Sequence, residues 1–208
     1  MAKLLYQGHA SYRIIDDAGH VIYVDPFTGG GYNAPADLIL VTHQHRDHNK
    51  VALCAKKPGC RVITNVEALA GGRHNDFDLG WVRVSSTTAC NKRHSADKCV
   101  GYIIELSGED GANNGIKIYA AGDTSKTEEM GKLAALDIDY ALLPGDGVFN
   151  MGLDEAAECA RLIGAKHNIP IHLKPPTLFK KNRYDRVMAE SWAAPNKLVV
   201  EPGNEISL

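Results

Sequence analysis

The sequence predicts an α/β fold, built as one domain over residues 1–208, and three observations support this prediction. Apolar, β-branched segments such as 38–41 and 140–143 have the length and composition of buried strands. Helical patterns are interspersed among these strands, as is typical of an α/β domain. No low-complexity linker divides the chain, and 208 residues are enough to bury one substantial core.

The composition is that of an ordinary soluble protein, with 44% hydrophobic residues and a net charge of -2. This charge gives no electrostatic case for a general nucleic-acid binder, and no apolar run approaches the roughly 20 residues of a membrane span. The first eight residues lack the apolar region and the cleavage site of a signal peptide, so we expect none. The five cysteines are odd in number and contain no C-x-x-C pair, which favours a reduced setting. We expect a cytoplasmic protein with a small-molecule substrate, no nucleic acid and no membrane; a homo-oligomer is left open.

The first half of the chain predicts strands joined by turns. Residues 3–7 and 11–15 form a hairpin pattern, and the β-branched, aromatic segment 21–24 ends at Asp25. The glycine-rich stretch 28–33 is a loop, because it lacks the spacing and the following helix of a phosphate-binding motif. Further strands are expected at 38–41, 61–64 and from 81 toward 89, and short helices at 50–57 and 66–70.

The second half repeats this alternation. The clearest helix is 155–163, where Asp154 is a suitable N-cap and small or apolar residues recur on one face. Asp123 follows a strand that ends in small residues. Strands are expected at 100–106, 116–120, 140–143, 170–173 and 197–200, and further helices at 128–136 and 183–192.

The segment 42–48 concentrates metal-binding side chains, with three imidazoles and one carboxylate directly after an apolar strand. His43 and His45 point to the same side in extended geometry, whereas Asp47 and His48 are adjacent and diverge. With two potential ligands on each of two sides, the segment suits a two-metal site, in which each side binds one ion. Imidazole with carboxylate suits zinc, iron or manganese rather than calcium. The alternatives are a structural zinc, although such sites are usually cysteine-rich, or a polar loop with chance histidines.

This segment is the T-H-x-H-x-D-H signature, and the chain here resembles the metallo-β-lactamase superfamily of metal-dependent hydrolases. Other segments resemble its ascorbate-6-phosphate lactonase-like branch: Gly8-His9-Ala10-Ser11, Val24-Asp25-Pro26-Phe27, Ile118 to Thr124, Ala141 to Pro144 and Ile169 to His172. The resemblance implies a four-layer αββα sandwich with the metals at one edge, between the two sheets.

The resemblance also implies a ligand set, which draws on both halves of the chain. It assigns His43 and His45 to the first metal, Asp47 and His48 to the second, Asp123 to a bridge between the ions, and His172 to completion of the second site.

The chain departs from the family pattern at the remaining ligand of the first metal. Asn91 stands where the superfamily usually has a histidine, and His94 follows three residues later, so either residue is a candidate ligand. The third alternative is a loosely held first metal, which leaves open whether the site holds two ions or one. Asp25 is expected to orient a ligand histidine or the loop beneath the metals. His9 lies on an early turn, where it lines the pocket or makes a simple hydrogen bond.

The expected function is hydrolysis of a small ester or lactone by a metal-bound hydroxide, with two divalent ions, zinc before manganese or iron. Asp47 is the expected catalytic residue, because it can orient the hydroxide and pass a proton to the leaving group. An anionic substrate would meet the basic run after His172, unless this run is only a solvated face: Lys174, Lys180, Lys181 and Arg183. The alternatives are a phosphodiesterase and, because of the change at Asn91, a non-catalytic protein that binds ligands in a metal pocket.

Overall fold

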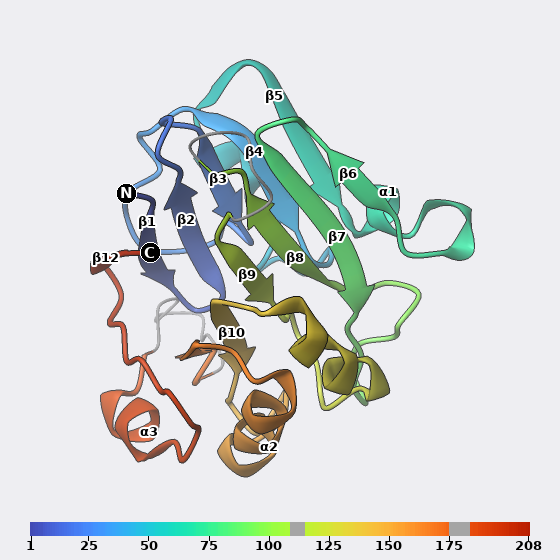
Figure 1. Cartoon of the computed structure of the whole chain (residues 1–208), viewed down its shortest axis with the longest axis vertical. Coiled ribbons are helices and arrows are strands. Elements are labelled where there is room, and N and C mark those ends of the chain that lie inside the picture. Colours follow the sequence, from blue (N-terminus) through green and yellow to red (C-terminus); the bar gives the residue numbers. More distant parts are fainter. Residues whose placement is uncertain (109–114, 175–183) are drawn as a thin grey trace.

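Two six-stranded mixed sheets form the computed structural model, which describes residues 1–108, 115–174 and 184–208 (Figure 1). The first sheet has the strand order β12-β1-β2-β3-β4-β5 and the second β11-β10-β9-β8-β7-β6. The strands of the first sheet are β1 (Lys3–Gly8), β2 (Ser11–Ile15), β3 (Val21–Val24), β4 (Ala36–Val41), β5 (Lys56–Thr64) and β12 (Glu205–Ser207). Those of the second are β6 (Asp76–Asp78), β7 (Val82–Thr88), β8 (Val100–Leu106), β9 (Lys117–Ala120), β10 (Tyr140–Pro144) and β11 (His167–Ile171).

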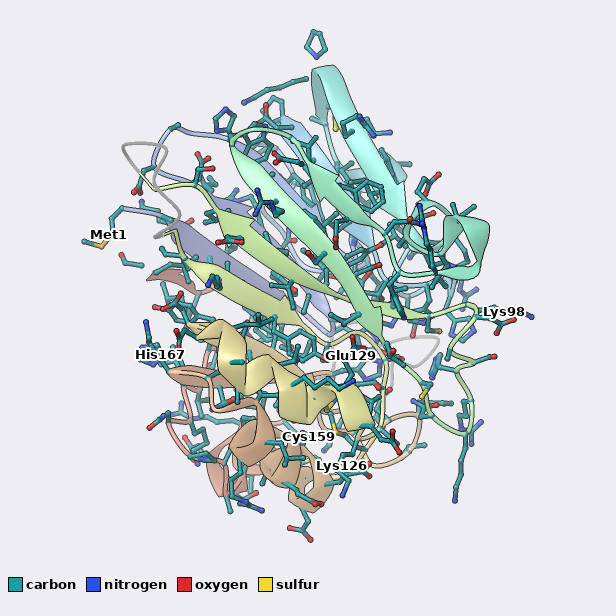
Figure 2. The ribbon with its side chains drawn as sticks, turned by 45° about the vertical axis from the view of Figure 1, so that its right-hand side comes forward. Met1, Lys98, Lys126, Glu129, Cys159 and His167 are labelled. Carbon is teal, nitrogen blue, oxygen red and sulfur yellow. The ribbon has the colours of Figure 1, made fainter. Side chains whose placement is uncertain are left out.

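Helices cover the outer face of the second sheet, and Figure 2 shows Cys159 within this helical layer. The covering elements pack against Tyr119, Ala141 and Leu143 of the sheet. The outer face of the first sheet packs instead against a short 3-10 turn and the loop after β3. The helices are α1 (Asn65–Ala68), α2 (Leu153–Ile163) and α3 (Arg186–Ser191), and the 3-10 segments are η1 (Val51–Leu53), η2 (Ala70–Gly72) and η3 (Glu128–Leu136). The predicted α/β sandwich is confirmed, and no helix of the described segments is long and apolar enough to cross a membrane.

Strand β4 is a continuous apolar run over 38–41 because it is buried on both faces of the sheet. Leu38 and Leu40 point into the core between the sheets, whereas Ile39 and Val41 join the cluster on the outer face. Successive side chains of a strand face opposite sides, so a strand covered on both faces needs apolar residues at every position. This strand leads directly into the histidine segment.

The directions of the strands determine which residues meet. β1 and β3 are both antiparallel to β2, and β3, β4 and β5 are parallel, so the carboxyl ends of β1, β3, β4 and β5 share one edge. In the second sheet, β7 and β9 are antiparallel to β8, and β9, β10 and β11 are parallel. Side chains that follow these strands therefore gather at one edge of the sandwich.

Gly122 lies where the two sheets approach each other at this edge. Its φ of 67° is left-handed, and a Cβ atom there would lie 2.6 Å from the carbonyl oxygen of Val100 and 3.2 Å from the Cβ of Thr42. Val100 in turn donates its N–H to the carbonyl of Thr42 at 3.0 Å. Only glycine fits both the conformation and the space, and this close approach brings Asp123 next to the segment that begins with His43.

Several predicted elements were wrong. Residues 50–57 form η1 and the start of β5 rather than a helix, and 197–200 contain only an isolated bridge from Lys197 to Asn168. The edge strands β6 and β12 were not predicted. β11 ends one residue before His172, so this histidine follows the strand rather than lying in it.

Candidate metal centre

Each predicted ligand follows the carboxyl end of a strand. The segment from His43 to His48 follows β4, His94 follows β7, Asp123 follows β9 and His172 follows β11. The structure brings them into three overlapping groups in which potential ligand atoms all lie within 4.8 Å of one another. These groups are His43, His45 and His94; His43, His48 and Asp123; and His9, Asp47, His48 and His172.

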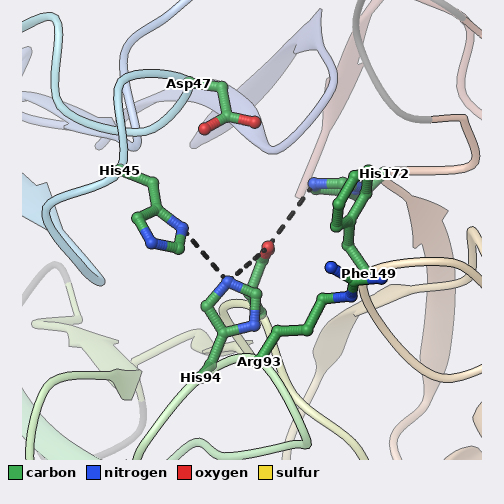
Figure 3. A pocket seen from close by; sticks show the side chains of 7 residues that line it. His45, Asp47, Arg93, His94, Phe149 and His172 are labelled. Atoms are coloured by element: carbon green, nitrogen blue, oxygen red, sulfur yellow. Dashed lines mark hydrogen bonds and ion pairs between the residues drawn. The ribbon is translucent and has the colours of Figure 1, made fainter.

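The first ligand set consists of three imidazoles. The ring centroids of His43, His45 and His94 lie 4.6 to 4.9 Å apart. The Nε2 of His94 is 3.2 Å from the Nδ1 of His45 (Figure 3). His43 and His94 are buried and His45 is exposed, so the set is reached from the cavity on the His45 side.

Asn91 orients His94 instead of pointing its own oxygen into this set. The Oδ1 of Asn91 accepts the backbone N–H groups of Arg93 and His94 at 2.8 and 3.0 Å, and it lies 2.9 Å from the Nδ1 of His94. An Nδ1–H donated to Asn91 leaves the Nε2 of His94 as the atom with a free lone pair. Of the two candidates from the sequence, His94 is therefore the one with a ligand atom in the cluster.

The second set combines a carboxylate with imidazoles. The Nε2 of His9 lies 3.3 Å from the Oδ2 of Asp47, and the ring of His9 packs on that of His172 with centroids 3.7 Å apart. The backbone N–H of His172 donates to the carbonyl of His9 at 2.9 Å. The first turn of the chain and its last predicted ligand are thus joined at the site.

Asp123 lies between the two sets. Its Oδ1 is 3.4 Å from the Nε2 of His48, and its Oδ2 is 3.5 and 3.6 Å from the Nε2 atoms of His94 and His172. Asp123 is therefore the only carboxylate among the predicted ligands that approaches imidazoles of both sets. This is the position that a bridging ligand requires.

Asp25 contacts two residues of the segment that carries the candidate ligands. Its Oδ2 accepts the hydroxyl of Thr42 at 2.7 Å and lies 2.9 Å from the Nδ1 of His48. Its Oδ1 accepts the backbone N–H of Thr42 at 2.8 Å. A carboxylate on the far nitrogen of a ligand histidine fixes the tautomer and the ring orientation.

Asp146 makes the equivalent contact to His172, and the sequence analysis missed it. Its Oδ2 is 2.7 Å from the Nδ1 of His172, while its Oδ1 accepts the N–H groups of three residues of its own loop. The signal was available, because Asp146 follows the buried strand β10 much as Asp123 follows β9.

Three residues of the site hold a left-handed backbone although they are not glycine. The φ angles of His9, Asp25 and His172 are 57°, 46° and 48°. This conformation is uncommon for residues with a Cβ, although histidine and aspartate are among the residues that tolerate it best. Each of the three directly follows a strand or its last glycine, where the turn aims the side chain toward the cluster.

Neighbouring histidines of the cluster differ in protonation. Burial, followed by the neighbouring His48, lowers the pKa of His43 to about 2, so its imidazole is neutral. Burial would also lower the pKa of His48, but the carboxylates of Asp123 and Asp25 outweigh it and raise this pKa to about 9. The surrounding imidazoles hold the pKa of Asp123 well below its usual range despite burial, so it is ionised.

The cluster fits a bound metal better than a self-contained hydrogen-bond network. The Nε2 atoms of His43, His48 and His172 and the Oδ1 of Asp123 are buried without a hydrogen-bond partner. Such atoms are costly unless another group satisfies them. Divalent cations held by imidazole and carboxylate would do so, and the donor chemistry suits zinc, iron or manganese.

A cavity of about 370 Å³ opens over the ligands (Figure 3). Besides His45, Asp47, His94, Asp123 and His172, it is lined by Arg93 and Phe149, neither of which the sequence singled out. Among the described residues, the predicted basic run contributes no side chain to the cavity wall. Lys174 forms an ion pair with Asp185, and positions 180, 181 and 183 lie outside those residues.

Every candidate ligand lies within the part of the chain that a known family model matches. A family model described as the beta-lactamase superfamily domain matches residues 3–172. A UPF0173 metal-dependent hydrolase of Pyrococcus furiosus is 30% identical and is covered, like this chain, over 100% of its length. One of Rubrobacter xylanophilus is 32% identical over 82% of this chain and 81% of its own. A solved metallo hydrolase of Ignicoccus hospitalis aligns with a TM-score of 0.72 at 23% identity, over 99% of this chain and 97% of that chain.

Proposed function

Because this chain belongs to the UPF0173 metal-dependent hydrolase family of the metallo-β-lactamase superfamily, we propose that it hydrolyses a small ester or lactone with the help of two divalent ions. The observation that carries this proposal is the pair of ligand sets joined by Asp123. His43, His45 and His94 would hold one ion, and Asp47, His48 and His172 the other. Zinc is the first choice for these donors, before manganese or iron.

Bound divalent ions would supply two kinds of chemistry, polarisation of a substrate oxygen and a lowered pKa of water. Asp47 is the residue that can orient the attacking water, because its carboxylate faces the cavity (Figure 3). Burial would raise the pKa of Asp47, but the hydrogen bond to His9 and the charge of His48 hold it below its usual range. The ionised carboxylate can accept a proton and deliver it to the leaving group.

The cavity supports a small substrate. Its volume of about 370 Å³ falls at the lower end of the range of small-molecule sites. Ester or lactone cleavage ranks first because the segments around His9, Asp25 and Asp123 resemble the ascorbate-6-phosphate lactonase-like branch. Phosphodiester cleavage ranks second, since the same ions and the same oriented water can also act on phosphorus.

The test compares metal-free protein with protein reloaded with zinc, manganese or iron on one panel of five- and six-membered lactones, simple aryl esters and bis(p-nitrophenyl) phosphate. We expect lactone or ester turnover only after reloading. Turnover of the phosphodiester alone would change the substrate class. Full loading without turnover of any panel member would favour a non-catalytic binding role, and full activity of the metal-free protein would overturn the proposal.

Metal uptake should release protons mainly from the second set. Metal binding needs neutral imidazoles, and the pKa of His48 is raised to about 9 while that of His43 is lowered to about 2. As the pH falls below about 9, protons compete for His48, so the affinity of the second ion should weaken by up to about tenfold per pH unit. The affinity of the first ion should change less.

Calorimetry of the metal-free protein with zinc, in buffers of different ionisation enthalpy, measures this proton release. Titrations between about pH 6.5 and 9 separate the two events. Equal proton release by both ions, or a second affinity that does not depend on pH, would contradict the assignment of His48 to a separate set.

A further inference from the structure

Arg93 is a cation in the wall of the metal cavity. It lines the cavity together with His45, Asp47, His94, Asp123 and His172. Its guanidinium carbon lies 4.9 Å from the centroid of the Phe149 ring, and Figure 3 shows the side chain extending across the cavity wall toward that ring. This contact is a cation–π interaction, which holds an otherwise flexible side chain in one place.

The guanidinium has no acidic partner within the described parts of the chain. Arg13, Arg83 and Arg186 each pair with a carboxylate, whereas Arg46, Arg61, Arg73, Arg93 and Arg161 pair with none that the structure describes. Of these five unpaired arginines, only Arg93 lines the metal cavity. The two carboxylates of the same cavity are already committed, Asp47 to His9 and Asp123 to the imidazoles around it. The donors of Arg93 are therefore available to a ligand.

Arg93 and Phe149 are both hydrogen-bonded, through their backbones, to residues that orient the candidate metal ligands. The Oδ1 of Asn91 accepts the backbone N–H of Arg93 at 2.8 Å as well as that of His94. The Nδ2 of Asn91 donates to the carbonyl of Phe149 at 3.0 Å. The N–H of Phe149 donates at 2.8 Å to Asp146, which also holds His172. The hydrogen bonds that position the ligands thus also hold the backbones from which Arg93 and Phe149 reach into the cavity wall.

We propose that Arg93 is the specificity residue of this enzyme and binds an anionic group of the substrate, a carboxylate or a phosphate, while the bond to be cleaved lies at the metal centre. Arginine presents several N–H donors in a planar fork that matches either group with two hydrogen bonds. Phe149 is a positioning residue that keeps the fork turned along the cavity. This inference rests on the proposed function and narrows its substrate class to anionic esters or lactones.

The test measures binding rather than turnover, so it remains informative if the enzyme cleaves a bond outside the ester and lactone class. Zinc-loaded protein is titrated by calorimetry with dicarboxylates from malonate to adipate, each compared with the monocarboxylate of the same carbon number. A second arm compares 3-phosphonopropionate with propionate. We expect at least one two-headed ligand to bind about 10-fold or more tightly than its one-headed partner, as a charge-assisted hydrogen bond provides. The arm with the larger ratio identifies carboxylate or phosphate.

Substitutions test whether Arg93 causes the difference in affinity between two-headed and one-headed ligands. Arg93→Gln should abolish the advantage of the two-headed ligand and leave the one-headed ligand and the zinc content unchanged. Arg93→Lys should retain part of the advantage, because it keeps the charge but loses the fork. Phe149→Leu should reduce the advantage about threefold, because a leucine keeps the apolar contact without the ring.

The matched control is Lys92→Gln, which removes the same charge from the neighbouring exposed position, outside the metal cavity. It should leave all affinities unchanged. Equal binding of one- and two-headed ligands by the parent protein would overturn the inference. An equal loss in Lys92→Gln and Arg93→Gln would also overturn it, because the effect would then be one of general charge.

Discussion

Asp123→Ala is expected to abolish hydrolysis, with a fall in kcat/KM of at least about 10³-fold, and to reduce the bound zinc from about two ions to one or fewer. Asp123 is the carboxylate that approaches His48, His94 and His172 at 3.4 to 3.6 Å. Its loss removes a shared ligand of both sets and the negative charge that offsets two cations. Metal content by atomic emission and initial rates on the most active panel substrate measure the two effects.

The isosteric variant Asp123→Asn separates charge from packing. It keeps the shape of the side chain, so a loss of metal without a change in thermal stability of the metal-free protein would identify the charge as the cause. Asp97→Ala is the control, since Asp97 is an exposed carboxylate on the loop that carries His94. Full zinc content and full activity in Asp123→Ala would show that Asp123 is not a shared ligand.

His94→Ala should lose the first ion and most of the activity, by about 10²-fold or more, whereas Asn91→Ala should weaken metal binding by about 10- to 100-fold. The smaller effect is that of a residue which orients a ligand through a hydrogen bond. The structure predicts this order because the Nε2 of His94 lies in the first set, whereas the Oδ1 of Asn91 is occupied by backbone N–H groups and by the Nδ1 of His94.

Zinc titrations of the two variants measure the order directly, and His74→Ala serves as the control, because His74 is an exposed histidine that does not line the cavity. A larger loss of affinity in Asn91→Ala than in His94→Ala would reverse the assignment. Equal and complete loss in both would mean that the loop 91–94 holds the metal only as a unit.

The parts of the site that could be predicted from the sequence are those encoded locally. A buried strand followed by closely spaced histidines is visible within about ten residues, so the segment after β4 was identified and its position at a sheet edge followed. Asp123 was also identifiable, because small residues precede it at the end of a strand. Local sequence could not decide between Asn91 and His94. That choice depends on which way the loop turns, and Asn91 itself determines the turn through its hydrogen bonds.

The missed features depend on contacts between distant segments. Arg93 and Phe149 line the cavity only because two loops, 56 residues apart in the chain, are joined by the hydrogen bond from Asn91 to the carbonyl of Phe149. β12 was missed for a similar reason. Its three residues carry little pattern of their own and become a strand by pairing with β1. Residues 50–57 were wrongly predicted as a helix because the edge strand β5 begins with two lysines followed by Pro58 and Gly59, a pattern that is also typical of a helix end.

The left-handed backbone at His9, Asp25 and His172 affects how many mutations this chain can tolerate. Each such residue costs roughly 1–2 kcal/mol relative to ordinary backbone, against a typical total stability of about 5–15 kcal/mol. Metal binding to the folded state restores stability in proportion to the logarithm of the metal concentration. The number of destabilising mutations that the chain can accumulate therefore depends on metal supply. Where metal is abundant, the chain should tolerate more destabilising substitutions outside the site than where metal is scarce.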